Sequence, residues 1–444
     1  MNIYIETMGC PKNRNDSENV AGILKAAGHG ITDDPEEADA VIVNTCGFID
    51  AAKRESIDRI FDFIRFNDQC GEDRKLLIVS GCLSQRYGSE LYEELPEVDI
   101  FMGVNDYERL PEILAKHEAG SRGKYLSAAE RDMDAMQRTD AENAYSRTIK
   151  ISEGCDNNCT YCIIPKIRGR YRSRPMEDIA REAEMLASQG CRELVIIAED
   201  TSAYGIDIYG KYELPALLRK LCAVDGIEWI RLMYCYAERI TDELIEVMAG
   251  EEKICDYIDI PLQHASDSVL RRMNRKTTNS EIRGTIAKLR AAMPDINIRT
   301  TLITGFPGET EEDFEELYEF CGEMKFERLG VFTYSREDGT PAAEMDGQIE
   351  EEVKERRLDA IMTLQRGISL EHNRGLVGTV QEVLIESREE PGVYIGRTRY
   401  DAPEIDDAVI VRSRNDHEPG DIINVLIEDA FDYDITGTET GERK

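Results

Sequence analysis

The 444-residue sequence predicts a multidomain α/β protein that contains two parallel α/β domains and a small β-barrel. Three observations lead to this fold class. Short apolar runs alternate with helical stretches over residues 1–115, which is typical of a parallel sheet. The same alternation occurs six times between residues 148 and 335 and predicts a partial (βα)6 barrel. Residues 376–437 contain β-rich runs broken by Pro-Gly pairs, which is typical of a small antiparallel barrel.

The N-terminal domain, residues 1–117, is predicted to contain four strands and two helices. The strands are expected at Asn2–Glu6, Ala40–Asn44, Leu76–Ser80 and Asp99–Val104, and the helices near 15–27 and 50–66. The first three strands run into Cys10, Cys46 and Cys82, which lie at equal intervals. Because the carboxyl ends of parallel strands meet at one edge of a sheet, where ligands bind, we expect these cysteines to converge. One such residue would be interpreted as a buried thiol, but three favour a cluster site.

Residues 118–147 are polar and poor in large apolar side chains, which predicts a linker or surface loop. The second domain, residues 148–335, has six predicted strands, at Thr148–Ser152, Leu194–Ala198, Trp229–Tyr234, Tyr257–Pro261, Asn297–Ile303 and Arg328–Tyr334. Amphipathic helices are expected in the gaps between them, for example at 176–189, 241–249, 280–291 and 311–322. The chemistry of βα barrels takes place at the C-terminal ends of the strands.

Cys155, Cys159 and Cys162 follow the first of these six strands with C-x3-C-x2-C spacing. Three thiolates can hold three irons of a 4Fe–4S cube and leave the fourth iron open to a small molecule. A zinc site is the main alternative, but structural zinc sites close with four ligands. No further Cys or His lies close to this motif in the sequence. The spacing therefore favours an iron–sulfur cluster.

Residues 336–375 are predicted to connect the second domain to the third, with a charged amphipathic helix at 350–373. The third domain, residues 376–444, has β-rich runs at 379–387, 393–399, 408–413 and 422–430, and carries 17 acidic and 7 basic residues. The whole chain has a net charge of −35. This charge suits a basic protein partner better than a nucleic acid, although acidity can also simply aid solubility.

Membrane insertion and export are not indicated by the sequence. It has no long apolar run, and its N-terminus has neither a basic nor an apolar signal region. Twelve cysteines are too sparse for a disulfide scaffold in a chain of this length. We therefore expect a cytoplasmic protein without a membrane partner. The cysteines outside the two trios, at positions 70, 191, 222, 235, 255 and 321, are interpreted as core or incidental thiols.

Several segments resemble the methylthiotransferases of the radical SAM superfamily, and the resemblance covers nearly the whole chain. The segments are ETMGCPKNRNDSE (6–18), VIVNTCGFIDAAKRESID (41–58), SGCLSQRY (80–87), ISEGCDNNCTYCIIPKIRGRYRSRP (151–175), AEDTSAYG (198–205), PLQHAS (261–266) and GFPGET (305–310). Tyr161 is the aromatic residue that this superfamily usually has before the last cysteine of its motif. The sequence is most similar to the branch that modifies an aspartate of a small-subunit ribosomal protein. It departs from that branch at Glu199, where glutamine is usual.

The resemblance implies an N-terminal three-cysteine domain, a radical SAM barrel and a C-terminal OB-like TRAM domain. Two 4Fe–4S clusters are implied. Cys155, Cys159 and Cys162 would bind the cluster that holds S-adenosylmethionine (SAM), and Cys10, Cys46 and Cys82 would bind an auxiliary cluster that carries the sulfur. Two SAM molecules would be used per turnover: one methylates the sulfur, and one-electron cleavage of the other gives the radical that takes a hydrogen from the aspartate β-carbon. A low-potential electron donor of the flavodoxin or ferredoxin type is also implied.

Candidate SAM-binding residues, besides the cluster cysteines, are Tyr161, Glu199, Asp200, Gly305 and Gly308. Glu199 and Asp200 follow the second barrel strand and can hold the SAM amino group or substrate; a solvated loop is the alternative. Gly305 and Gly308 allow close approach of backbone to a ligand, and an ordinary turn before a helix is the alternative.

Two further features have alternative interpretations. His264 can line the site or be a hydrogen-bonded structural histidine. The arginines at positions 168, 170, 172 and 174 can bind the SAM carboxylate or the substrate. Ion pairs with the abundant acids are the alternative, which we prefer for at least two of the four.

Two other functions fit parts of the sequence. A tRNA methylthiotransferase would have the same fold, but its TRAM domain is expected to be basic, and no tRNA partner is expected here. An iron–sulfur electron carrier or redox sensor would need the two clusters but would not cleave SAM.

Overall fold

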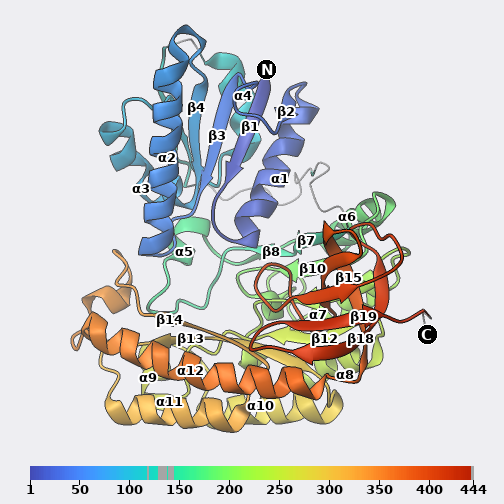
Figure 1. Ribbon diagram of the computed structural model, residues 1–444. Coiled ribbons are helices and arrows are strands. Elements are labelled where there is room, and N and C mark those ends of the chain that lie inside the picture. The colour runs from blue at the N-terminus through green and yellow to red at the C-terminus, as the bar shows by residue number, and fades with distance from the viewer. Residues whose placement is uncertain (118–119, 129–137, 139–144, 442–444) are drawn as a thin grey trace. The chain divides into compact units, whose positions relative to one another are not determined.

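The computed structural model in Figure 1 describes residues 1–117, 120–128, 138 and 145–441. No helix among these residues is both long and apolar enough to cross a membrane.

The chain divides into two compact units. The first unit is formed by residues 1–141, 152–174 and 337–340, and the second by 142–151, 175–336 and 341–444. Residues 152–174, which the sequence places in the second domain, thus belong to the first unit. The five-segment division expected from the sequence remains a prediction.

A sheet of six parallel strands forms the centre of the first unit, in the order β2-β1-β3-β4-β5-β6. The strands are β1 (Asn2–Thr7), β2 (Gly30–Thr32), β3 (Ala40–Thr45), β4 (Leu76–Gly81), β5 (Ile100–Met102) and β6 (Gly123–Tyr125). All four strands expected in this region are present. β2 and β6 were not expected, because three-residue strands carry too little apolar pattern. β6 also corrects the predicted linker, much of which lies outside the described residues.

Helices cover both faces of this sheet, which explains why β3 is buried along its whole length. On one face, α1 (Pro11–Ala26) and α4 (Leu110–Lys116) pack against side chains such as Ile42 and Ile78. On the other face, α2 (Asp50–Cys70) and α3 (Cys82–Glu94) pack against alternate residues such as Val43 and Val79.

Residues 152–174 complete the first unit. The short strands β8 (Ser152–Glu153) and β9 (Arg172–Ser173) pair antiparallel. Between them lies the five-residue helix α5 (Ile164–Arg168), which contacts α3 at its first residue, Cys82. Ile163 and Ile167 of this segment belong to the same apolar core as α1 and α4.

The second unit contains the predicted six-stranded parallel sheet, with its strands side by side in chain order. They are β7 (Ser146–Lys150), β10 (Glu193–Ile197), β11 (Trp229–Leu232), β12 (Ile254–Asp259), β13 (Asn297–Thr304) and β14 (Arg328–Thr333). This order confirms the partial (βα)6 barrel. The helices α7 (Leu214–Cys222) and α9 (Asp267–Arg272) lie in gaps between strands for which the sequence predicted no helix bounds.

The helices of the second unit pack on one face of this sheet around a single large core. They include α6 (Met176–Ser188), α8 (Asp242–Gly250), α10 (Asn279–Ala292), α11 (Glu311–Met324) and α12 (Glu351–Gly375). α10 and α11 begin with capping boxes, in which Thr278 pairs with Glu281 and Thr310 with Asp313. The expected helix at 350–373 is confirmed by α12.

The C-terminal segment forms a closed five-stranded barrel, in the order β15-β16-β17-β19-β18. The strands are β15 (Val380–Glu390), β16 (Val393–Thr398), β17 (Val409–Arg412), β18 (Ile422–Ala430) and β19 (Ile435–Glu439). The predicted barrel is confirmed with one correction. β17 and β19 pair parallel, while the other neighbours pair antiparallel. The strand β19 was not expected.

This barrel packs against the helix-free face of the parallel sheet. Val195 and Ile197 of β10 contact the barrel side, whereas the alternate residues Leu194 and Ile196 face the helices. The interface also contains a buried ion cluster, in which Glu193 pairs with Arg231 and Arg397. The barrel thereby closes part of this face of the sheet.

Candidate functional site

Cys10, Cys46 and Cys82 lie at the carboxyl ends of β1, β3 and β4, three neighbouring strands in the middle of the first sheet. Cys10 precedes α1, and Cys82 is the first residue of α3. The chain leaves β1 toward β2 on one side and returns to β3 on the other. The carboxyl edge between β1 and β3 is therefore the topological switch point, where open α/β sheets bind ligands.

The structure brings these three cysteines together. Gly9 approaches Cys46 so closely that a Cβ at position 9 would lie 3.0 Å from the Cys46 sulfur. Burial raises the pKa of Cys46, and the neighbouring Cys10 raises it further. Burial raises the pKa of Cys82 to about 12, with smaller contributions from Cys10 and Cys46. Without a metal, the Cys82 thiol thus keeps its proton, and metal binding would release it.

Asn13 and Ser56 hold the backbone around this edge. The Asn13 amide nitrogen donates to the carbonyl oxygens of Met8 and Thr45, both at 3.0 Å. The Ser56 hydroxyl accepts from the N–H of Cys46 at 3.0 Å and donates to its carbonyl at 3.1 Å. Asn13 thus joins the loops after β1 and β3, and Ser56 fixes the position of Cys46. Sequence reasoning missed both residues, because buried Asn and Ser carry no spacing signal.

Arg168 has its guanidinium group beside the same edge, with 2% of the residue exposed. Its Nη2 donates to Asn13 Oδ1 at 2.8 Å and to the Cys82 sulfur at 3.3 Å. Its Nη1 donates to Asp16 and Glu153 at 2.9 and 3.0 Å. Of the stripe of four arginines, this one points into the first unit. Arg170 is largely exposed and pairs with Asp156 at 3.1 Å, as the ion-pair interpretation expected.

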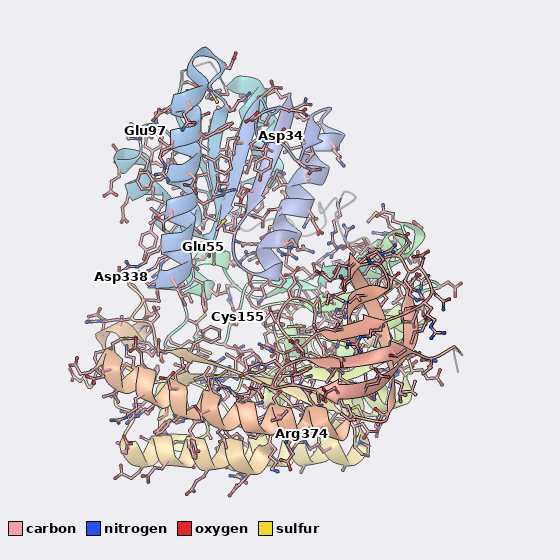
Figure 2. The ribbon with its side chains drawn as sticks, in the orientation of Figure 1. Asp34, Glu55, Glu97, Cys155, Asp338 and Arg374 are labelled. Atoms are coloured by element: carbon pink, nitrogen blue, oxygen red, sulfur yellow. The ribbon has the colours of Figure 1, made fainter. Side chains whose placement is uncertain are left out.

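Cys155, Cys159 and Cys162 lie in the loop between β8 and α5 of the first unit, where Figure 2 labels Cys155. Cys155 and Cys159 are buried, and Cys162 is half-buried. The N–H of Cys155 donates to the carbonyl of Gly169 at 3.2 Å, and the N–H of Cys162 to that of Cys159 at 3.0 Å. The loop is therefore tied at both ends by its backbone.

A hollow of 340 Å³ opens beside this loop, and Tyr161 lies in the loop itself, half-buried. The hollow is lined by Cys155, Asp156, Asn158, Pro165, Gly169 and Arg170. The Asn157 amide donates to the Cys155 sulfur at 3.4 Å. A small molecule bound at this loop would thus meet a thiol, backbone and both signs of charge.

The donor chemistry of both trios fits iron–sulfur clusters, which are held by cysteine thiolates. Among the described residues, no three Cys, His, Asp or Glu side chains are grouped closely enough to hold one metal ion. The thiolates of a cube bind different irons and so stand farther apart than ligands that share one ion. The fit therefore rests on the residue types and their common placement.

Glu199 and Asp200 lie in the second unit, directly beyond the carboxyl end of β10. Asp200 is buried and accepts from the Ser202 hydroxyl at 2.8 Å and from the Ala203 N–H at 3.2 Å. It also pairs with Arg239. These contacts give Asp200 a structural role at the turn η3 (Thr201–Ala203), in addition to its predicted role in SAM binding.

Gly305 and Gly308 follow β13 at the same edge of the second sheet. The loop is held by Glu309, whose Oε2 accepts from the N–H groups of Gly305 and Phe306 at 2.8 and 3.0 Å. Glu309 also contacts His264, 3.7 Å from Nε2. His264 is fully buried and its Nδ1 accepts from the Ser266 N–H at 3.0 Å, as expected of a structural histidine. Sequence reasoning missed Glu309, because bonds from a side chain to nearby loop backbone leave no spacing signal.

Comparison with known families divides the chain into three parts. Residues 2–103 match a family described as Uncharacterized protein family UPF0004. Residues 149–321 match the Radical SAM superfamily, and residues 377–439 match the TRAM domain. The first match contains one cysteine trio and the second contains the other.

Curated relatives are similar over nearly their whole length. A protein of Lachnoclostridium phytofermentans named "Ribosomal protein uS12 methylthiotransferase RimO" is 48% identical over 99% of this chain and 100% of its own. A protein of the same name from Clostridioides difficile is 48% identical over 98% of each chain.

Solved structures with a similar fold are radical SAM enzymes. The methyltransferase TsrM of Kitasatospora setae, solved with cobalamin and a 4Fe–4S cluster, has a TM-score of 0.55 at 13% identity and covers 88% of this chain and 81% of its own. The cobalamin-dependent enzyme OxsB has a TM-score of 0.51 at 13% identity, covering 82% of this chain and 56% of its own. At such identity, the likeness shows the fold alone.

Proposed function

This chain belongs to the RimO family of ribosomal protein uS12 methylthiotransferases, and we propose that it adds a methylthio group to the β-carbon of an aspartate in uS12 by radical SAM chemistry. The observation that supports this most strongly is 48% identity along 99% of the chain, which extends through both cysteine trios. An unactivated C–H bond offers no acid–base route, so a cofactor must carry the reaction.

Cys155, Cys159 and Cys162 are the proposed ligands of the cluster that binds SAM. When bound, a cube with one open iron supplies the coordination and the electron for reductive cleavage of SAM. The protein holds the loop through its backbone bonds at Cys155 and Cys162. Tyr161, Glu199, Asp200, Gly305 and Gly308 remain proposed contacts of SAM.

Cys10, Cys46 and Cys82 are the proposed ligands of a second, auxiliary cluster. Their convergence at the switch point of the first sheet supports this assignment. The burial of Cys46 and Cys82 would keep water from two of the three ligands. Ser56 and Asn13 hold the surrounding backbone and would keep the site in shape.

The iron content tests the two-cluster proposal. After anaerobic reconstitution, we expect about eight irons per chain, and about four after Cys10, Cys46 and Cys82 are all changed to Ala. This triple variant should still cleave SAM but no longer transfer the methylthio group. Cys70→Ala is the matched control and should keep all the iron. Full iron content in the triple variant would contradict the auxiliary site.

The SAM-binding cluster is tested separately. Cys155→Ala, Cys159→Ala and Cys162→Ala should each abolish SAM cleavage, because a missing ligand exposes a second iron and destabilises the cube. Zinc in place of iron after anaerobic purification, without SAM cleavage, would contradict this assignment. A chain that held both clusters without ever cleaving SAM would instead be a redox protein.

The proposed partners are uS12, a low-potential flavodoxin or ferredoxin, and no tRNA. The 17 acidic and 7 basic residues from Leu376 onward support a basic protein rather than RNA. Since the substrate belongs to the ribosome, the reaction is proposed to take place in the cytoplasm. Mass spectrometry of cells that lack this protein should show uS12 without the methylthio mass and tRNA unchanged. The opposite pattern would make the chain a tRNA methylthiotransferase.

A further inference from the structure

Arg168 connects the two cysteine trios of the first unit. Glu153, two residues before Cys155, accepts from Nη1 of Arg168, and Arg168 itself ends the helix that follows Cys162. The other terminal nitrogen of the guanidinium group, Nη2, donates to the sulfur of Cys82 at 3.3 Å. One side chain thus bonds both to the segment that carries one trio and to a thiol of the other.

The residues around Arg168 fix the orientation of its guanidinium group. Asp16 and Glu153 both accept from Nη1, while Asn13 Oδ1 accepts from Nη2. All of these side chains are buried, Asp16 and Asn13 completely. The two carboxylates more than offset the single buried positive charge of Arg168, which would be strongly unfavourable without a partner. As a result, the Nη2 edge of the guanidinium is held against Cys82.

We propose that Arg168 is a positioning residue of the auxiliary cluster, where it donates a hydrogen bond to the Cys82 ligand and raises the reduction potential of that cluster. The proposal rests on the auxiliary cluster proposed above. Reduction adds negative charge to a cluster, and a nearby cation with a hydrogen bond to a ligand sulfur stabilises the more negative form. Bonds to metal ligands also orient them, and their loss typically weakens metal binding.

Arginine suits this position better than lysine. Its planar fork makes all four bonds at once and keeps its charge at every accessible pH. A lysine ammonium is a single point that cannot reach the two carboxylates, the Asn13 oxygen and the Cys82 sulfur together. The Arg168→Lys variant therefore keeps the positive charge but loses the directed hydrogen bonds, so it tests the two effects separately.

The experiment isolates the auxiliary cluster in a chain in which Cys155, Cys159 and Cys162 are changed to Ala. In this background, we compare Arg168, Arg168→Met and Arg168→Lys after anaerobic reconstitution. The readouts are iron retained against a chelator and the reduction potential measured by electron paramagnetic resonance. Arg65→Gln is the matched control, since that side chain is 64% exposed on α2 of the same unit.

We expect Arg168→Met to shift the reduction potential to a more negative value and to weaken iron retention about tenfold or more. Arg168→Lys should recover part of the potential but not the retention, and Arg65→Gln should change neither. If the folded Arg168→Met chain keeps the parental potential and iron, the proposal is overturned. If that variant does not fold, an unchanged potential and unchanged retention in Arg168→Lys overturn it instead. A background chain that binds no iron at all would refute the auxiliary cluster itself, a distinct failure.

Discussion

Gly305 and Gly308 lie in the left-handed region, with φ of 71° and 74°. A Cβ at position 305 would collide with the side chain of Lys354, and one at 308 with that of Arg272, which also bonds to the Gly308 carbonyl. The backbone conformation and the close neighbours therefore explain glycine at both positions without any contact to SAM. Their role in SAM binding is a separate prediction.

Gly308→Ala is expected to destabilise the fold by about 1–3 kcal/mol and so lower the thermal midpoint of unfolding, because it places alanine in the left-handed backbone region. Gly284→Ala is the control, since Gly284 lies within α10 with open space around it and should gain about 1 kcal/mol in helix propensity. Calorimetry of the metal-free chain measures both. Weaker SAM binding in Gly308→Ala at an unchanged midpoint would show that the ligand, and not packing, requires the glycine.

Glu193 is a second residue whose contribution to stability can be measured. Burial alone would raise its pKa, but the guanidinium groups of Arg397 and Arg231, with hydrogen bonds from Arg397 and Ser146, outweigh burial and lower the pKa from 4.5 to about 2. Its contribution to stability is therefore complete above pH 4.5. Below that, the unfolded chain takes up a proton first, and the contribution is lost as the pH falls toward 2, on the order of 3 kcal/mol.

Unfolding of the metal-free chain in urea over this pH range tests the effect. Trp229 is the only tryptophan of the chain and lies at the sheet–barrel interface, with the Arg397 guanidinium 6.0 Å from its ring centre. Its fluorescence thus reports this interface. Glu193→Gln should flatten the stability change between pH 4.5 and 2, whereas Glu243→Gln, an exposed partner of Arg219, should keep the parental profile. An unaltered profile in Glu193→Gln would show that other groups cause the acid sensitivity.

At the scale of elements, not every acid of the C-terminal barrel is available to a partner. The acids at 401, 404, 406 and 407 belong to the excess of acidic residues that predicts a basic partner. Asp401 instead accepts from Arg328 at 2.6 Å, and Asp406 accepts from the Tyr257 hydroxyl at 2.8 Å. Asp407 lies 3.1 Å from Arg328, and of the four only Glu404 is exposed. Three of these acids thus join the barrel to the sheet.

Asp401→Lys is accordingly expected to weaken the sheet–barrel interface, because it places two cations together where an ion pair was buried. The free energy of unfolding, followed by Trp229 fluorescence, should fall by about 3–5 kcal/mol. Reversal of exposed barrel acids such as Glu390 and Asp416 should leave this transition unchanged but raise the KM for uS12. If Asp401→Lys raised that KM without loosening the interface, Asp401 would contact the substrate protein rather than hold the barrel to the sheet.

The elements that sequence predicted well are those with a periodic apolar pattern. β3 and the strands of the second sheet belong to this group, because buried parallel strands read as apolar runs. β2 and β6 are too short for a pattern, and the parallel pairing of β17 with β19 depends on barrel closure rather than on local residues.

The residues of the candidate site also fall into two groups, those that the sequence predicts and those that only the fold shows. The six cysteines stand out because their spacing and their position after strands are visible in the sequence. Asn13, Ser56 and Glu309 act through bonds to backbone that is distant in the chain, which no spacing records. Arg168 and Arg170 have the same residue type two positions apart, and only the fold shows that one is buried and the other exposed.

At the scale of the whole molecule, the net charge of −35 is the dominant property. A strongly acidic surface attracts a basic substrate protein from a distance and speeds productive encounter. The Debye length shortens from about 30 Å at 0.01 M salt to about 8 Å at 0.15 M, so this attraction is screened within the ordinary experimental range. SAM is a small molecule with a single net positive charge, so it gains much less from this field than a highly charged protein does.

We therefore expect kcat/KM for methylthio transfer to uS12 to fall several-fold between about 0.05 M and about 0.5 M salt, because screening slows association of the two proteins. With a chemical reductant in both assays, uncoupled SAM cleavage by the same preparation should change little, since it then needs no protein encounter, and it serves as the internal control. Initial rates at low uS12 concentration measure the association-limited quantity. An equal loss of both activities would instead point to an effect of salt on the clusters or the fold. Methylthio transfer that is insensitive to salt would show that local contacts, and not the net charge of −35, govern recognition of the substrate.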